Sequence, residues 1–443
     1  MVMDMVKVLT MACILAIAYV VGVVVYRLYF SPLARFPGPK LAAATLWYEF
    51  YYDVILKGQY TFKIKDLHQK YGPIIRISPY ELHINDPEYY STLYSHSSPK
   101  DKYYYYVKPF DFPRSSFGTE SAQVHRFRRG AMNPFFSRGK VLQHEGLVQE
   151  LVRKFCDRIE GFGKTSQIVP LSLGFTCLTT DLITSFVLKR SYRFLEATDW
   201  NPHWGQTLRD ASELGMMSRQ VTWMLPILKS LPRAWAEALN PGLVLFFSLV
   251  QRTYQRIAEV EQQRDMAEKG NACSERGYTL IDQILDSKLP DDEKTPERLA
   301  EEIRSAIGAG TETTSNALTV TVYHILRDPS KTQRLRQELE GIEPNPDREI
   351  KLRELEQLPY LVGTKTTIQA CEIRVNDEPV IMYPRRPAAA IGMTSILQHH
   401  DESIFPDSYS YVPERWLGEE KRKRLERYLV SFSKGSRRCI GMR

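Results

Sequence analysis

The chain has 443 residues, 43% of them hydrophobic, so it can bury a large core, and its length alone allows two to three domains. Its 59 basic and 52 acidic residues give a formal net charge of +7, a mild excess without any nucleic-acid motif, so we expect no nucleic-acid partner. Six scattered cysteines show neither CxxC pairs nor zinc-like spacing, which argues against a disulfide framework and favours a reducing, cytosolic environment.

The N-terminus begins with an uncharged apolar run from Val8 to Val25. About 18 residues are enough to cross a bilayer and are longer than the apolar core of a usual signal peptide. Arg27, Arg35 and Lys40 come after the run, so the positive-inside tendency places the bulk of the chain in the cytoplasm. A buried core helix is the alternative reading. We expect residues 1–30 to be a membrane anchor.

A stiff spacer and two short strands are expected next. Residues 36–39 read Phe-Pro-Gly-Pro, which cannot continue a helix and separates the anchor from the rest of the chain. The turn sequence Tyr-Gly-Pro at residues 71–73 precedes two short apolar segments, 74–77 and 81–84, which read as strands.

The next segments have mostly helical patterns. His125 and Arg129 are four residues apart and would share one face of a helix, although a solvated basic face is the simpler interpretation of that pattern alone. From about residue 142 to 267 the apolar spacing is helical. We expect interruptions at Pro202, Pro226, Pro232 and Pro241. Cys156 and Cys177 stand among apolar residues within this stretch, which predicts that both lie in the core.

A long helix is expected from Thr295 to about Leu326. Thr295 is a suitable N-cap and is followed by proline at the first helical position, and Asp-Pro at residues 328–329 ends the pattern. Some 30 residues give a length of about 45 Å, enough to cross a whole domain. Four residues share one face of its central part, and three of them are small: Ala306, Gly310, Thr313 and Ala317.

The centre of this helix carries groups suited to proton transfer. Gly308 and Gly310 weaken a helix by roughly 1 kcal/mol each relative to alanine, which suggests a local opening of its hydrogen bonds. Thr313 could hold a water there, and the neighbouring Glu312 could relay protons, as in general acid catalysis. A core helix with a glycine kink is the alternative reading.

A basic segment, Lys421 to Arg424 together with Arg427, stands shortly before the C-terminal loop. Its simplest interpretation is a solvated face. A docking surface for an acidic redox partner is the second interpretation.

The loop around Cys439 has the composition of a site for a single thiolate ligand to haem iron. Gly435 can adopt the positive backbone angles of a tight turn, and Gly441 removes bulk beside the sulfur. Phe432 can shield the sulfur from water, and Arg437 can neutralise a carboxylate by charge-assisted hydrogen bonds. A free cysteine in a basic loop is the alternative.

Two motifs together resemble the cytochrome P-450 family; the anchor with the hinge after it resembles the microsomal branch, and the segment 71–74 resembles the fungal members. The first is Phe-x-x-Gly-x-Arg-x-Cys-x-Gly over residues 432–441, and the second is Ala-Gly-x-Glu-Thr-Thr over residues 309–314. The resemblance implies a mainly α fold with a small β-sheet, forming one haem-thiolate monooxygenase domain over residues 31–443 behind the anchor. It also implies an endoplasmic-reticulum membrane protein of single-pass topology whose catalytic domain faces the cytoplasm.

The resemblance further implies a haem cofactor whose axial thiolate is Cys439, and it assigns roles to other residues. Glu312 and Thr313 would be catalytic and deliver protons. The implied cofactor-binding residues, besides the cysteine, are His125, Arg129, Ala309, Gly310, Phe432, Gly435, Arg437 and Gly441. Of these, His125, Arg129 and Arg437 would hold the haem propionates.

The implied reaction inserts one atom of dioxygen into a lipophilic small molecule, such as a secondary metabolite, with electrons from NADPH through NADPH–cytochrome P-450 reductase. Two alternatives stay open. One is a haem-thiolate isomerase or dehydratase that needs no electrons, which the Glu312–Thr313 pair disfavours. The other is a non-catalytic remnant or mis-spliced product that cannot hold haem stably. The residues do not name the substrate.

The chain departs from the family pattern in two places. Residues 358–361 should introduce a helix containing Glu-x-x-Arg, but no such spacing occurs between Leu361 and Pro413, and residues 372–374 are one residue short of it. We therefore expect an irregular region over 362–397 without a clear helix, and a buried, unpaired Arg415. The sequence also stops two residues after Gly441, where the family begins a helix, so the expected fold is incomplete.

Overall fold

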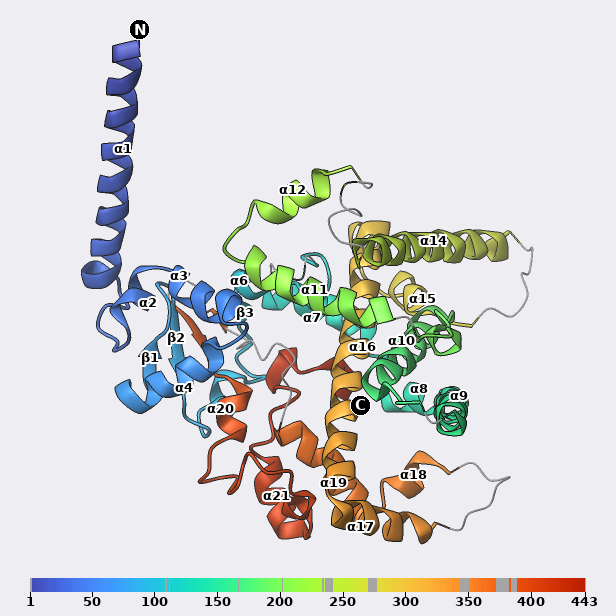
Figure 1. Ribbon diagram of the computed structural model, residues 1–443. Helices are drawn as coiled ribbons and strands as arrows, with labels where there is room; N and C mark the ends of the chain where they lie inside the picture. The colour runs from blue at the N-terminus through green and yellow to red at the C-terminus, as the bar shows by residue number, and fades with distance from the viewer. Residues whose placement is uncertain are drawn as a thin grey trace.

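The computed structural model shows a small sheet beside a larger helical body, through which one long helix, α16 (Pro296–Arg327), runs (Figure 1). This is the mainly helical fold with a small sheet that the sequence predicted. The structure describes residues 2–107, 110, 112–165, 167–200, 202–232, 235, 242–269, 277–342, 350–371, 382–383 and 389–442.

The first helix, α1 (Val2–Val25), projects away from the body and continues into η1 (Tyr26–Phe30) (Figure 1). The segment Met3–Phe30 has 28 residues, a mean hydropathy of 2.7 and no part buried in the body, so its length and composition would allow it to cross a membrane. Helix α10 (Leu171–Leu188) passes the same test of length and hydropathy, but 56% of it is buried, as in a core helix.

Short helices and a five-stranded sheet come after the anchor. The helices are α2 (Lys40–Ala44), α3 (Trp47–Phe50), η2 (Tyr51–Ile55) and α4 (Tyr60–Tyr71). The strands are β1 (Ile74–Arg76), β2 (Glu81–Ile84), β3 (Asp101–Lys102), β4 (Met382–Tyr383) and β5 (Ala390–Gly392). Strands β1 and β2 confirm the two that the sequence predicted.

The strand order is β1-β2-β5-β4-β3, with β2 parallel to β5 and the other pairs antiparallel. Strands β4 and β5 come from late in the chain, so the sheet joins segments that are about 300 residues apart in the sequence. Because Lys102 pairs with Met382, β3 is fixed at the edge of the sheet, next to the helical body.

The helical body is built in chain order from short and long helices. Before α16 these are α5 (Tyr90–Leu93), α6 (Tyr104–Val107), α7 (Ala122–Met132), α8 (Arg138–Leu142), α9 (Glu145–Lys164), α10, η4 (Phe194–Glu196), α11 (Pro202–Ser218), α12 (Met224–Ser230), α14 (Gly242–Glu268), α15 (Leu280–Leu285) and η5 (Asp291–Glu293). After α16 come α17 (Pro329–Glu340), α18 (Leu352–Leu355), α19 (Pro359–Cys371), α20 (Ser395–His399), η6 (Pro413–Trp416), α21 (Glu419–Glu426), η7 (Gly435–Arg437) and η8 (Ile440–Met442).

The largest core cluster lies between α7, α10, α14, α15 and α16. Met132, Val187, Val260, Ile281 and Ile303 are members, one from each of these helices. Burying such side chains supplies the main favourable term in folding, and here it fixes α16 against the helices that surround it.

The long helix confirms the sequence prediction. Thr295 caps it, with the side-chain oxygen accepting a hydrogen bond from the Arg298 backbone N–H, and a proline occupies the first turn. The local opening expected at Gly308 and Gly310 is not present, because α16 is a continuous α-helix over its whole length. Packing against α10 outweighs the intrinsic cost of the two glycines.

The prolines and cysteines of residues 142–267 agree only in part with the sequence prediction. Pro202 begins α11 and Pro232 comes after α12, as expected. Pro226 lies within the first turn of α12, where the ring is tolerated because those N–H groups have no partner inside the helix, so the predicted break there is wrong. Pro241 lies outside the described residues. Cys177 is buried, but Cys156 is exposed, because it lies on the solvent side of α9.

The absence of a helix after Leu361 was also predicted wrongly, since α19 runs to Cys371. The buried face of α19 is hard to recognise in the sequence because threonines, which are polar, form part of it. The hydroxyl of Thr367 is fully buried and donates to the Gly363 carbonyl at 2.7 Å, and Thr366 donates to Val362 in the same way. Residues 372–374, with the shortened Glu-x-Arg, lie outside the described residues.

Arg415 is buried, as expected, but it is not unpaired. Its guanidinium donates to the backbone carbonyls of Pro406, at 2.5 Å, and Asp407, at 3.0 Å. Helix α19 packs closely on η6, which carries Arg415; a Cβ added at Gly363 would lie 2.8 Å from the Pro413 carbonyl oxygen. Backbone oxygens therefore accept hydrogen bonds from the guanidinium that was expected to lack a partner.

Candidate cofactor and active site

The loop around Cys439 is held in a specific shape by its backbone. The Cys439 N–H donates to the Phe432 carbonyl at 2.9 Å, which closes the loop. Gly435 has a φ of +72°, and a Cβ there would lie 2.4 Å from the Tyr94 carbonyl oxygen, so glycine is required, as the sequence predicted. The Cys439 side chain is exposed and free, and Phe432 is half-buried.

Gly441 has a different environment. A Cβ there would lie 3.8 Å from the Cys439 sulfur, which is an ordinary van der Waals contact, and its backbone angles are not restricted to glycine. Its predicted role beside a cofactor, like the shielding role of Phe432, stays a prediction.

Arg437 lies behind the loop in an unusual environment. Its terminal nitrogens donate to the backbone carbonyls of Thr119, at 2.7 Å, and Glu120, at 2.6 Å, while its Nε is buried without an acceptor. Burial lowers the pKa of the Arg437 guanidinium to about 10, and the charge of Asp101 only partly opposes this. The side chain is fixed by neutral oxygens, so its positive charge is not neutralised by an ion pair within the described structure.

Four basic side chains converge at this place. Burial and then the charges of Arg437, Arg129 and Lys102 lower the pKa of His125 to about 3. Burial and then Arg437 lower the pKa of Lys102 to about 7. His125 and Arg129 both lie on α7, and Arg129 donates to the Arg438 carbonyl at 2.8 Å, so the predicted face of this helix does meet the cysteine loop. We call Lys102, His125, Arg129 and Arg437 the cation cluster.

No pattern in the sequence pointed to Lys102, the fourth member of the cation cluster. It precedes a run of four tyrosines and belongs to no motif. Only the pairing of β3 with β4, which joins positions about 280 residues apart, places it beside Arg437. Its Nζ lies 3.8 Å from the Phe117 ring centroid and donates to the Phe117 carbonyl at 3.1 Å.

These residues fit a haem. Its two propionates are anions, and the cation cluster contains a buried donor without an acceptor and two groups whose pKa values are lowered by burial and then by neighbouring positive charge. An anion placed there would oppose the part of these shifts that comes from positive charge and could accept from that donor. The exposed thiol of Cys439 is the soft ligand that such an iron would take from the adjoining loop.

The centre of α16 places the predicted proton-transfer pair together. The Thr313 hydroxyl donates to the Ala309 carbonyl at 2.7 Å, and both residues are exposed on the surface of the helix. Burial raises the pKa of Glu312, and the positive charge of Arg209 only partly opposes that shift. A carboxyl with a raised pKa beside an accessible hydroxyl is suited to proton transfer.

Gly310 serves the packing of the helices. A Cβ there would lie 2.8 Å from the Ile183 side chain of α10, whereas a Cβ at Gly308 would meet nothing within 4 Å. The structure therefore explains why Gly310 is glycine by the contact between α10 and α16. Its predicted role at a cofactor stays a prediction, as does that of Ala309.

The cysteine loop and α16 lie side by side. Ile440, the neighbour of Cys439, packs against the core cluster that contains Ile303 and Ile307 of α16. Figure 1 shows the C-terminal end of the chain beside the middle of this helix. The thiol and the proton-transfer pair are thus brought to the same part of the molecule.

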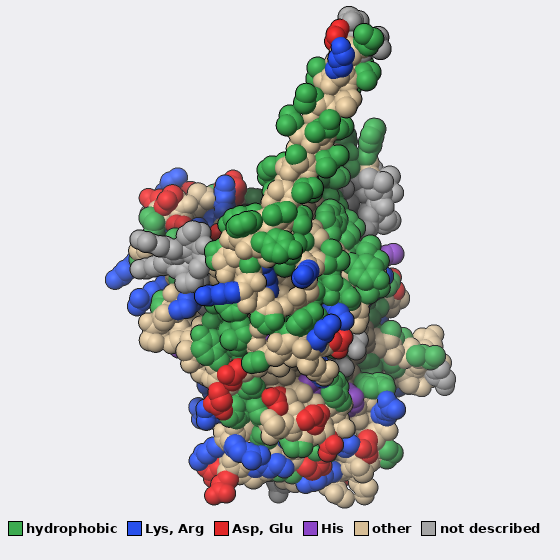
Figure 2. Space-filling view, turned by 90° about the vertical axis from the view of Figure 1, so that its left-hand side faces the viewer, with side chains coloured by type: hydrophobic (Ala, Val, Ile, Leu, Met, Phe, Trp, Pro, Cys, Tyr) green, Lys and Arg blue, Asp and Glu red, His purple; other side chains and the backbone are tan. Residues whose placement is uncertain are grey.

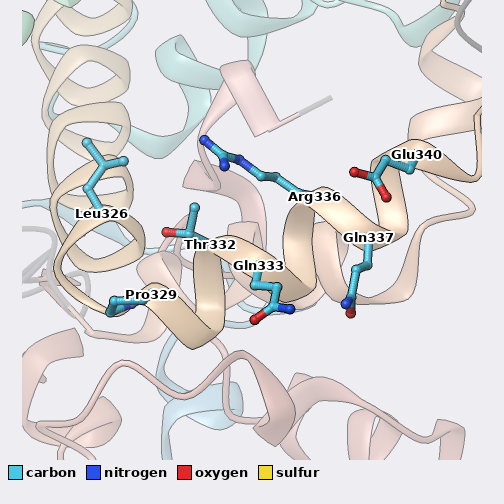
Figure 3. Close-up of a pocket in the computed structure, with 7 residues that line it drawn as sticks. All are labelled: Leu326, Pro329, Thr332, Gln333, Arg336, Gln337 and Glu340. Atoms are coloured by element: carbon cyan, nitrogen blue, oxygen red, sulfur yellow. The ribbon is translucent and has the colours of Figure 1, made fainter.

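A surface groove is separate from this region. Its lining comes from the last turn of α16 and from α17: Leu326, Pro329, Thr332, Gln333, Arg336, Gln337 and Glu340 (Figure 3). Leu326 is about 20 Å along the helix from Thr313, so the groove shares no residue with the site described above.

Comparison with known proteins agrees with these observations. The family model described as Cytochrome P-450 matches residues 37–364 and 389–443, and the gap between these two stretches, 365–388, falls within the region 362–397 that was expected to be irregular. A cytochrome P-450 monooxygenase of Ascocoryne sarcoides is 41% identical, covering 96% of this chain and 86% of that protein. A tryptophan 6-hydroxylase of Fusarium equiseti is 38% identical, covering 94% and 83%. An N-acetyltryptophan 6-hydroxylase of Emericella nidulans is 35% identical, covering 97% and 86%.

Proposed function

The chain belongs to the cytochrome P-450 family, and from that premise we propose that it is a membrane-anchored haem-thiolate monooxygenase acting on a lipophilic small molecule. The observation that carries the proposal is the cation cluster, which lies next to the exposed Cys439: Arg129 donates to the Arg438 carbonyl at 2.8 Å, and the buried Nε of Arg437 has no acceptor. Family membership gives the general class, a haem monooxygenase for small molecules. The assignment of residues is our inference from the geometry.

In this proposal Cys439 binds the iron, and the cation cluster binds the two propionates. When bound, haem with an axial thiolate supplies activation of dioxygen. The Thr313 hydroxyl donates to the Ala309 carbonyl, so its oxygen can hold a water at the surface of α16 as the proton donor. The Glu312 carboxyl, whose pKa is raised, would replace the proton that this water gives up. The Phe432 side chain restricts the access of water to the sulfur.

Electrons would come from NADPH through cytochrome P-450 reductase. The segment 421–427 is a weaker docking surface than the sequence suggested. Lys423 pairs with Glu419 at 2.5 Å, Arg422 pairs with Glu426 at 3.3 Å, and Arg427 pairs with Glu88, so three of its five cations are already paired. These contacts favour the interpretation of a solvated face.

The surface beside α1 supports a membrane location. Figure 2 shows apolar side chains gathered at the base of this helix. Exposed members there are Tyr29, Phe30, Leu41, Trp47 and Tyr51. Tryptophan and tyrosine favour the membrane–water interface, so this patch would rest on the bilayer once α1 had crossed it. The cations that come after α1 favour the endoplasmic-reticulum orientation with the body in the cytoplasm.

The alternatives receive less support. An isomerase or dehydratase would have little use for the Glu312–Thr313 pair. A remnant unable to fold around haem was suggested by the missing Glu-x-x-Arg, but α19 is packed on η6 and the Arg415 guanidinium is hydrogen-bonded to backbone carbonyls.

Turnover with labelled dioxygen tests the proposal. Microsomes containing the protein and its reductase are supplied with NADPH, isotopically labelled dioxygen and a panel that includes tryptophan and N-acetyltryptophan, since two relatives are named for these substrates. We expect one labelled oxygen in an NADPH-dependent product. A product formed equally without NADPH and carrying no label would instead support the isomerase or dehydratase.

A further inference from the structure

We propose that residues 112–120, here called the clamp segment, transmit the position of α16 to the cation cluster, and that Glu302 and Arg128 are positioning residues for the cofactor. The inference rests on the proposed function, because the cation cluster is taken to bind the haem carboxylates. Neither residue belongs to a motif that the sequence analysis identified.

The clamp segment has no regular secondary structure, and its own polar groups give it shape. The Ser115 hydroxyl donates to the Phe112 carbonyl at 2.8 Å, and the Thr119 hydroxyl donates to the Ser115 carbonyl at 2.6 Å. A Cβ at Gly118 would lie 1.8 Å from the Phe112 carbonyl oxygen, so only glycine allows the fold. The segment is therefore compact.

Helix α16 holds one side of the clamp segment. The Glu302 carboxylate accepts from the Ser116 N–H at 2.9 Å and from the Ser116 hydroxyl at 2.6 Å. The neighbouring Glu301 accepts from the Arg114 N–H at 2.6 Å. Glu302 is 2% exposed, so water does not compete for these bonds.

An ion network links Glu302 to α7. Arg298 donates to Glu302 at 2.9 Å and to Glu293 at 3.0 Å. Arg128 of α7 binds Glu293 with two parallel bonds, both 2.7 Å long, and donates from a third nitrogen to the Thr119 hydroxyl at 2.8 Å. These contacts run from Glu302 through Arg298, Glu293 and Arg128, and they return to the clamp segment at Thr119.

The clamp segment supplies the carbonyls that hold two of the four cations. Arg437 donates to the oxygens of Thr119 and Glu120, and the Lys102 side chain donates to that of Phe117. The Lys102 backbone N–H also donates to the Glu120 carbonyl, at 2.8 Å. Carbonyls orient a cation without cancelling its charge, which leaves both side chains available for an anionic ligand. A displaced clamp segment would therefore misplace Lys102 and Arg437 together.

Two variants and a matched control test this coupling in the full-length protein. Arg128→Lys removes the two parallel bonds, and Glu302→Gln removes the charge while keeping the size. Arg264→Lys is the control, because Arg264 also bridges two acids, Asp282 at 3.2 Å and Asp286 at 2.6 Å, and so joins α14 to α15. Each protein is assayed for haem loss to excess apomyoglobin, for the propionate bands in resonance Raman spectra, and for its stability in urea.

We expect haem loss about tenfold faster in Arg128→Lys and Glu302→Gln, with shifted propionate bands, and neither change in Arg264→Lys. Haem loss and propionate bands that match the wild type in both variants, or that follow urea stability alone in all three proteins, would overturn the coupling. Should Glu302→Gln fail to fold, Arg128→Lys decides the result.

Amide hydrogen exchange separates this inference from the proposed function, since it needs no cofactor. Both positioning variants should exchange faster than the wild type in residues 112–120 and 432–439, and the control should not. Unchanged exchange in these segments refutes the coupling. A wild-type protein that shows the expected exchange pattern but takes up no haem would instead refute the proposed function.

Discussion

Gly435→Ala should disrupt the cysteine loop more than an alanine substitution at the other glycine of the loop, Gly441. Alanine in the left-handed conformation, at a φ of +72°, costs roughly 1–2 kcal/mol. The new Cβ would lie 2.4 Å from the Tyr94 carbonyl oxygen, whereas carbon–oxygen contacts are normally about 3.3 Å, so the loop must move by about 0.9 Å. Such overpacking adds about 1–3 kcal/mol. We therefore expect a loss of about 2–5 kcal/mol in the free energy of unfolding.

Gly441→Ala is the matched control, because its Cβ would make only an ordinary contact, 3.8 Å from the Cys439 sulfur. We expect a change below about 1 kcal/mol for it. Urea unfolding of the cofactor-free proteins in detergent, followed by tryptophan fluorescence, measures both. Equal free energies of unfolding for the two variants would refute the reasoning about the loop.

Three further predictions concern α16, the cation cluster and Glu49 of α3. Gly310→Ala should lower thermal stability because its Cβ would lie 2.8 Å from the Ile183 side chain. Gly308→Ala should stabilise the protein by up to about 1 kcal/mol, because its Cβ would meet nothing within 4 Å and alanine favours a helix. The opposite order of the two variants in calorimetry would contradict the packing argument. The pKa of Lys102 is lowered to about 7 in the folded state, so the unfolded chain binds more protons and the stability of the cofactor-free protein should rise with pH from about 7 to 10.5. Lys102→Met should flatten that part of a urea-denaturation profile, and an unchanged slope counts against the cation cluster. Glu49 shows the reverse. Burial and the charge of Glu81 raise its pKa to about 8, and the paired Arg219, at 3.1 Å, only partly opposes this, so its contribution to stability falls as pH rises from about 4.5 to 8. Glu49→Gln should reduce that fall, and a steeper fall would contradict the raised pKa.

The parts of the structure that local patterns specify could be predicted from the sequence. Strands β1 and β2 follow from short apolar runs after a turn, and α16 follows from its cap, its proline and its periodicity. The requirement for glycine at position 435 also follows from the motif, because a tight turn has few solutions.

The failures come from contacts between distant segments. Lys102 reaches the cation cluster only through a strand pairing that no local pattern encodes. Helix α19 was missed because Thr366 and Thr367 are polar by type, although both hydroxyls donate to backbone carbonyls of the same helix. Arg415 was expected to be unpaired because backbone acceptors cannot be read from side-chain motifs.

The carbon monoxide difference spectrum of the reduced protein tests the central claim most directly. The wild type and Cys156→Ser, which replaces another exposed free thiol, should both show the Soret band typical of a thiolate-bound haem. Cys439→Ser should abolish that band. A wild-type protein without it, or a Cys439→Ser variant that retains it, would contradict the assignment of Cys439 and the cation cluster as the haem site.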